Sequence, residues 1–252
     1  TKSSPPTSRS SGTLRPGAAA PSGSSSGGTT TIAAAADDSA GGPVGSFART
    51  LLQPRPATRL VVDVLVQKGA DYRAANLQHT VDVLREVTGK PVDVAGPFTF
   101  SSEATSHSAD AIRSLAAAHG RTPQGSGVAA LRLLVLRGKF ADGAAALGVA
   151  VQGEVIAIFP EQTERASTIA VSRQRIEEAV LTHEMGHLLG LVDLVIDRNR
   201  DDGSHPGHSK NSQSVMYWAI DSDVITQVLD GPPPIELDSA DRTDLAAIRA
   251  GG

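Results

Sequence analysis

The chain has 252 residues, a formal net charge of -4 at pH 7, no cysteine and only 3% aromatic residues. The lack of cysteine excludes disulfides and thiolate metal sites, and the acidic balance without a dense Lys/Arg cluster argues against nucleic acid or an anionic membrane as the main partner. No apolar run approaches the roughly 18 residues that a membrane-spanning helix needs, so we expect no transmembrane segment.

Residues 1–46 are dominated by Ser, Gly, Pro, Thr and Ala. Such a segment buries too little apolar surface to offset its ordering entropy, so we predict a disordered leader or linker. The chain begins at Thr1 rather than Met, which suggests a processed product whose signal peptide has been removed. We therefore expect a secreted or cell-surface protein. A lipid tether upstream of Thr1 would suit such a leader, and a plain disordered terminus is the alternative.

Residues 47–252 are expected to form one folded domain. Apolar periodicities predict a strand at 59–66, a helix at 71–88, a strand at 91–100, a helix at 109–119 and a strand at 128–136. Strands at 147–151 and 155–159 follow as a hairpin, and then an amphipathic helix that starts near residue 173 and a last helix at 238–249. This order predicts an α/β (α+β) fold, a mixed twisted sheet backed by helices.

The helix that starts near residue 173 carries the pattern H-E-x-x-H. His183 and His187 are four residues apart, so both imidazoles project from one face and can share one metal ion. Glu184 lies beside them, where a carboxylate can accept a proton from a metal-activated water. Gly190 follows where a left-handed residue ends a helix. Two ordinary core histidines are the alternative reading of the pair.

H-E-x-x-H-x-x-G, followed by Met216 in Ser-Val-Met-Tyr-Trp, resembles the metzincin clan of zinc peptidases. The resemblance covers residues 59–250 and implies a zincin fold. Its upper half, 47–190, would hold the sheet and the active-site helix, and its smaller, irregular lower half, 191–252, the Met-turn and one helix. In that clan the Met-turn forms an apolar floor beneath the metal, and an ordinary core methionine is the alternative for Met216.

The sequence offers more than one third ligand, and a catalytic zinc site usually has three. Asp193 stands where the snapalysin-like branch of the clan has H-x-x-G-x-x-D. His208 matches the archaemetzincin pattern H-C-x-x-x-x-C-x-M, with Ser209 and Ser214 in the cysteine places, which excludes that family's cysteine-bound second metal. We favour His208, and Asp193 would then orient a ligand or tie down the loop. His205 is a third candidate, more typical of an exposed loop residue.

These implications describe a zinc endopeptidase with one catalytic Zn²⁺, Glu184 as the general base, and a protein or peptide as its substrate. The strands at 147–159 are similar to the archaemetzincin edge hairpin, to which a peptide can add as a further strand. Tyr217 is a candidate for a transition-state contact, with packing beside the turn as its alternative. We expect a monomer. The alternatives are an inactive zinc-binding module of zincin fold and an intracellular regulator that cleaves one partner protein.

Overall fold

The computed structural model describes residues 40–143 and 145–251, all of which belong to one structural unit, 34–252. The predicted leader lies mostly outside the described residues. Its last part, residues 40–46, forms turns joined to the hairpin region, since Gly41 N donates to Glu154 Oε2 at 2.9 Å and Gly153 N donates to Gly42 O at 3.0 Å. Within the described residues, no helix is both long and apolar enough to cross a membrane.

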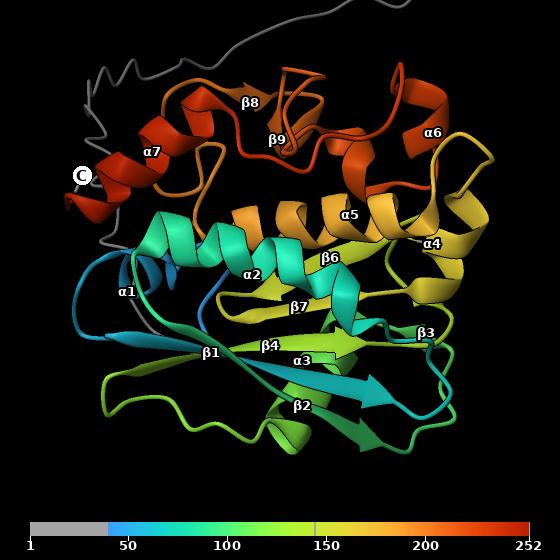
Figure 1. The fold of residues 1–252 in the computed structure, drawn as a ribbon, viewed down its shortest axis with the longest axis horizontal. Helices are drawn as coiled ribbons and strands as arrows, with labels where there is room; N and C mark the ends of the chain where they lie inside the picture. Colours follow the sequence, from blue (N-terminus) through green and yellow to red (C-terminus); the bar gives the residue numbers. More distant parts are fainter. Residues whose placement is uncertain (1–39, 144, 252) are drawn as a thin grey trace, which may run out of the picture. The chain divides into compact units, whose positions relative to one another are not determined.

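The main sheet has the strand order β2-β1-β4-β7-β6 (Figure 1). Its strands are β1 (Arg59–Gln67), β2 (Val92–Phe100), β4 (Val128–Val135), β6 (Gly148–Gln152) and β7 (Val155–Ile158). Strands β2, β1, β4 and β7 run parallel to one another. Strand β6 pairs antiparallel with β7 and forms one edge of the sheet. The predicted mixed sheet with an edge hairpin is therefore confirmed, and every strand of it lies close to its predicted range.

The inner strands β1, β4 and β7 are buried on both faces, whereas edge strand β2 is mostly exposed. Successive side chains of a strand point to opposite faces, so an inner strand contributes to the core on each side. In β1, Val62 and Val64 join the larger apolar cluster, whereas Leu65 joins a second one with Ile112 of the helix on the opposite face. Strands covered on both sides read as nearly continuous Val/Leu/Ile runs, which is why the sequence signals them so clearly.

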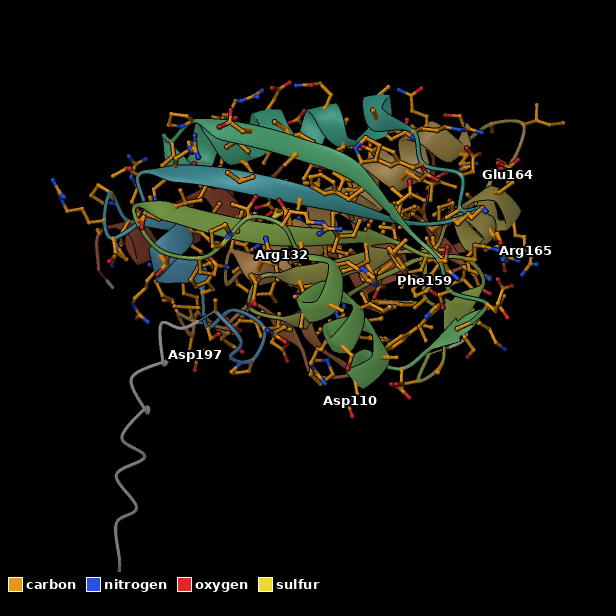
Figure 2. All side chains as sticks on the ribbon, turned by 90° about the horizontal axis from the view of Figure 1, so that it is seen from below. Asp110, Arg132, Phe159, Glu164, Arg165 and Asp197 are labelled. Carbon is orange, nitrogen blue, oxygen red and sulfur yellow. The ribbon has the colours of Figure 1, made fainter. Side chains whose placement is uncertain are left out.

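The helices of the described residues are α1 (Ala48–Leu52), α2 (Ala74–Thr88), α3 (Ala109–His119), α4 (Pro160–Ala166), α5 (Arg173–Leu188), α6 (Ile225–Val228) and α7 (Ser239–Arg249), with a 3₁₀ turn, η1 (Trp218–Asp221). Two short strand pairs complete the fold: β3 (Ser106–His107) with β5 (Lys139–Phe140), and β8 (Asp201–Asp202) with β9 (His205–Ser209). Seen from below, helix α3 crosses the sheet, and Asp110 marks the first turn of this helix (Figure 2). The sequence prediction missed α1, α4, α6, η1 and both short pairs.

Helix α5 lies between the sheet and the C-terminal segment that carries β8, β9, η1 and α7 (Figure 1). Residues 179–192 are consequently all buried. The amphipathic character predicted for the start of α5 is wrong in one respect, since two of its charged residues are not exposed. Arg173 Nε pairs with Glu177 Oε1 at 2.5 Å, and both side chains are buried. A helix covered on both sides has to pair its charges internally.

Candidate metal centre

The two histidines of α5 lie on one face of the helix, as the four-residue spacing predicts. His183 Nε2 and His187 Nε2 are 3.1 Å apart, and the two rings meet edge to face with their centroids 4.7 Å apart. Helix α5 begins at Ser172, whose hydroxyl accepts from Arg175 N, and Gly190 turns the chain away with φ +82°. The helix boundaries therefore leave the second histidine in the last turn, beside the exit loop.

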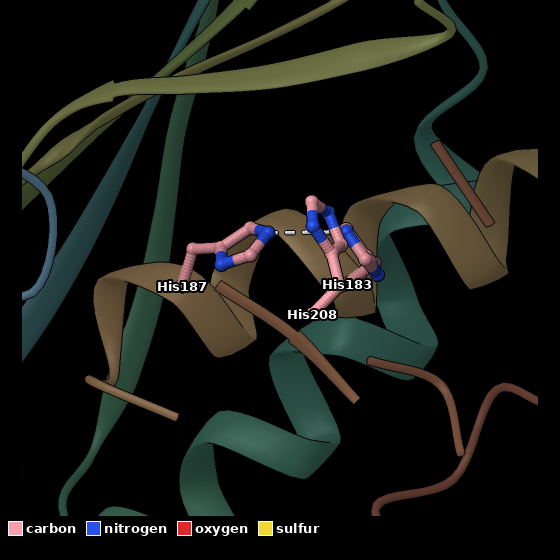
Figure 3. A group of neighbouring side chains, drawn as sticks. All are labelled: His183, His187 and His208. Carbon is pink, nitrogen blue, oxygen red and sulfur yellow. Dashed lines mark hydrogen bonds between the residues drawn. The ribbon is translucent and has the colours of Figure 1, made fainter. Parts of the chain in front are cut away.

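His208, from β9, brings a third ring to the same place (Figure 3). Its ring centroid lies 5.1 Å from those of His183 and of His187, and one ring nitrogen of each residue lies within 4.8 Å of the others. His208 Nε2 is buried and has no hydrogen-bond partner among the described residues. An orphaned imidazole nitrogen pointing at two others is the arrangement that a metal ion would satisfy.

The dimensions fit a zinc ion. Two imidazole nitrogens at about 2.1 Å from a tetrahedral zinc lie roughly 3.4 Å from each other. The observed 3.1 Å between the Nε2 atoms of His183 and His187 is close to this spacing, and the ring nitrogen of His208 lies within 4.8 Å of both. Nitrogen ligands of neutral imidazole also suit zinc chemically. His183, His187 and His208 are therefore able to hold one ion with little movement.

In His183 and His208, a hydrogen bond from Nδ1 leaves Nε2 as the free ring nitrogen. His183 Nδ1 donates to Val215 O at 2.7 Å, and His208 Nδ1 donates to Pro206 O at 3.2 Å, so each Nε2 carries a lone pair. Burial lowers the pKa of His183 to about 4. Burial is also the main reason that the pKa of His187 lies well below its usual range, and the charges of His183 and His208 lower it further. Burial likewise lowers the pKa of His208. At neutral pH all three rings are therefore in the neutral form that binds metals.

Met216 packs against helix α5 at Gly186, the residue before His187. It is fully buried, and its sulfur contacts Gly186 so closely that a Cβ at residue 186 has no room. The turn around it is closed by Tyr217 N donating to Ser214 O at 3.1 Å, and Met216 N donates to Ser214 Oγ at 3.1 Å. The Met-turn that the resemblance implies stays a prediction; the turn seen here supplies the Val215 carbonyl that orients His183.

The same turn also holds the strand that carries His208. Ser209 N donates to Met216 O at 2.8 Å, and Ser209 pairs with Tyr217 in a parallel bridge. At the same end of the hairpin as Ser209, Arg200 pairs at 2.6 Å with Asp241 and at 2.6 Å with Asp244, both buried residues of α7. The β8–β9 hairpin is thus attached to the turn around Met216 through Ser209, and to helix α7 through the preceding Arg200.

Glu184 points to the sheet side of the histidines, towards edge strand β6. Its carboxyl is buried, and its Oε1 has no partner among the described residues. A Cβ added at Gly148 in β6 would lie 2.9 Å from this oxygen, so only glycine leaves it room. Burial, and next the charge of Asp221, raise the pKa of Glu184 well above its usual range, with the Ala150 amide opposing them. The Glu184 carboxyl is therefore buried between β6 and the histidines, at the edge of the cleft that they line.

A cleft of about 240 Å³ opens onto this group, lined by Glu184, His187, His208, Asp221, Val44, Val149, Ala150, Leu194, Pro206 and Gly207. Sequence reasoning missed Asp221, which ends η1 and whose oxygen lies 3.9 Å from His208 Nε2. Burial raises the pKa of Asp221 to about 6. No motif marks this residue, and its only signal in the sequence is a carboxylate a few positions after the methionine.

The other predicted residues lie apart from the three histidines. The Asp193 carboxylate accepts backbone amides of Arg198, Arg200 and Asp201 at 2.7 to 2.8 Å, so it closes the loop after α5. His205 stacks on Trp218 with ring centroids 4.3 Å apart. Neither residue belongs to the groups of described side chains that are able to hold a metal. Tyr217 packs against the apolar core and does not line the cleft, so its contact with a substrate stays a prediction.

No protein-family model and no curated protein matches the sequence. Solved structures similar to it are archaemetzincins from Methanopyrus kandleri (15% identity, 78% of this chain and 98% of that one, TM-score 0.49) and Archaeoglobus fulgidus, complexed with malonate (14%, 75% and 99%, 0.42). A zinc-dependent peptidase from Methanocorpusculum labreanum is also similar (15%, 73% and 99%, 0.45). At such identities and TM-scores, likeness of the chain trace says nothing about which reaction a site performs.

Proposed function

We propose that the protein is a zinc-dependent endopeptidase of metzincin type, with His183, His187 and His208 as the metal ligands and Glu184 as the general base. The observation that carries the proposal is the convergence of three neutral ring nitrogens within 4.8 Å of one another. A buried, unpartnered carboxyl oxygen stands beside them in the same cleft. Three histidines leave one position of a tetrahedral ion open, which is typical of catalytic zinc sites.

When bound here, zinc supplies Lewis-acid polarisation of a carbonyl and lowers the pKa of water. Glu184 accepts a proton from the attacking water and returns it to the leaving amine. A bound zinc ion would favour the ionised carboxylate that the first step needs, against the burial that raises the pKa of Glu184. The Val215 and Pro206 carbonyls keep His183 and His208 in the tautomers that present Nε2.

Edge strand β6 provides the substrate surface in this proposal. It has a neighbour on one side only, β7, and its residues Val149 and Ala150 line the cleft beside Glu184. An extended peptide that pairs with the free edge of β6 would run past the metal position, with main-chain hydrogen bonds supplying affinity. Recognition of this kind favours cleavage within unstructured segments of proteins.

The test combines zinc content with cleavage of an unfolded protein substrate such as casein. Wild type should hold one zinc and cleave, His208→Ala should lose both metal and activity, and Asp193→Ala should keep the metal. If only Asp193→Ala loses zinc, the third ligand is assigned wrongly. Zinc retained by wild type without any cleavage would replace the endopeptidase with a zinc-binding module of the same fold.

A further inference from the structure

Asp221 is the one charged group of the cleft that the proposed reaction leaves without a task. Its oxygen is 3.9 Å from His208 Nε2. Asp221, Glu184 and His183 also form a second group whose ligand atoms all lie within 4.8 Å of one another. The Asp221 carboxylate therefore lies within 4.8 Å of a ring nitrogen of His183 and 3.9 Å from His208 Nε2, so it is close to two of the three imidazoles.

The charges of the cleft call for a cation at this position. The buried carboxyl of Glu184 and the partly exposed carboxyl of Asp221 have oxygens within 4.8 Å of each other, close enough for like charges to repel. Among the described residues that line the cleft, none is Lys or Arg. Holding two carboxylates this close without a compensating charge is costly, and a divalent ion would balance both. With the three imidazoles neutral and both carboxylates ionised, one divalent ion makes the group neutral.

The backbone holds Asp221 in place independently of its side chain. Leu147 N donates to Asp221 O at 2.6 Å, Asp223 N donates to Ala145 O at 2.9 Å, and Ala146 pairs with Ser222. The residue is thus tied to the segment that leads into β6. The Glu184 carboxyl lies against Gly148 of β6, whereas the Asp221 carboxyl lies 3.9 Å from His208 Nε2.

We propose that Asp221 is a fourth protein ligand of the centre, whose carboxylate closes the position that three histidines leave open until a substrate or small anion displaces it. Oxygen and nitrogen ligands on one zinc lie about 3.4 Å apart. The distance from Asp221 Oδ2 to His208 Nε2 is 3.9 Å, which exceeds this spacing by about half an ångström. The proposal rests on the metal centre proposed above and adds that the resting site is a three-histidine, one-carboxylate set.

Cobalt(II) substitution tests this without relying on activity, because its visible absorption reports the ligands directly. Wild type, Asp221→Asn and the control Asp223→Asn are compared for absorption spectrum, Co²⁺ affinity by chelator competition, and azide affinity. Asp223 is exposed and carries the same charge nearby. We expect Asp221→Asn to change the spectrum, to bind Co²⁺ about 10- to 100-fold more weakly and to bind azide more tightly, while Asp223→Asn matches wild type.

Asp221→Ala with added acetate guards against a folding defect. If the carboxylate is a ligand, acetate should restore the wild-type spectrum. An Asp221→Asn spectrum and azide affinity equal to those of wild type would overturn the proposal, as would weaker Co²⁺ binding with an unchanged spectrum, since that places the carboxylate outside the coordination sphere. Wild type that binds no Co²⁺ at all would overturn the metal centre itself, which is a distinct result.

Discussion

Replacing Gly186 with alanine tests the contact between the histidine helix and Met216. Gly186 lies inside α5, where Gly→Ala ordinarily stabilises a helix by about 1 kcal/mol. Here the new Cβ would collide with Met216 Sδ and lie 3.2 Å from its Cε and 3.3 Å from Leu191 Cδ1. Both neighbours are fully buried and have no free volume to enter, and overpacking costs about 1–3 kcal/mol. The net change should be roughly 0 to 2 kcal/mol of destabilisation.

A second substitution separates the collision from the helix propensity. Met216→Ala alone should cost about 2–5 kcal/mol, because the side chain is fully buried. In that background Gly186→Ala has room and should stabilise by about 1 kcal/mol. The coupling energy between the two substitutions is then about 1–3 kcal/mol.

The assay is urea unfolding of the metal-free protein, followed by circular dichroism and by the fluorescence of Trp218, the single tryptophan. Gly203→Ala serves as a control, because nothing lies within 4 Å of a Cβ there. It should change the stability by less than about 0.5 kcal/mol. If Gly186→Ala stabilises the protein by the same amount with Met or Ala at residue 216, the methionine does not lie against the histidine helix.

Glu184→Gln should lower kcat by about 10²- to 10⁴-fold with zinc content unchanged, because an amide cannot accept the proton; a variant that cleaves normally would remove Glu184 from the reaction. Burial lowers the pKa of His183 to about 4 from an ordinary 6.5, so the unfolded chain is protonated first as the pH falls and stability is lost from about pH 6.5 to 4. Relative to His183→Gln, the metal-free protein should lose about 3 kcal/mol over that window in urea titrations, and parallel pH curves would contradict the buried neutral ring. Arg200→Met takes the Arg200 cation from the buried Asp241, while Asp244 keeps Arg198 at 2.9 Å, and it should cost about 3–5 kcal/mol by the same unfolding assay. Arg198→Met, with a side chain 44% exposed, should cost less than about 1 kcal/mol, and equal losses would refute the distinction.

The sheet and the long helices could be predicted because their apolar periodicity follows directly from burial. The predicted 109–119 and 238–249 helices correspond closely to α3 and α7, and each begins at a side chain that caps it, Ser108 and Asp238. Helix α4 escaped because its sequence is almost entirely polar, and only Pro160 at its first position marks a helix start. The strands β8 and β9 escaped because residues 201–209 are Asp, Gly, Pro, His and Ser, which have little strand propensity.

The choice of third ligand illustrates what local pattern leaves open. The spacing of Asp193 from the helix pair suits a ligand as well as that of His208 suits the methionine turn. In the structure, three backbone amides take up the Asp193 carboxylate, whereas β9 is held against the turn by a hydrogen bond from Ser209. That loop conformation depends in turn on ion pairs between Arg200 and a helix some 40 residues further along the chain. Which side chain lies beside the two helix histidines thus depends on contacts distant in sequence, which no motif contains.

The position of Asp221 likewise depends on contacts that are distant in sequence. Its distance from α5 along the chain says nothing about its position, because η1 is placed by backbone pairing with residues 145–147 rather than by any feature of its own sequence. The same pairing fixes the start of β6, the strand against which Glu184 lies. A single junction therefore sets both the Glu184 side and the Asp221 side of the cleft. Any change in that junction should alter the base and the proposed fourth ligand together, and not one of them alone.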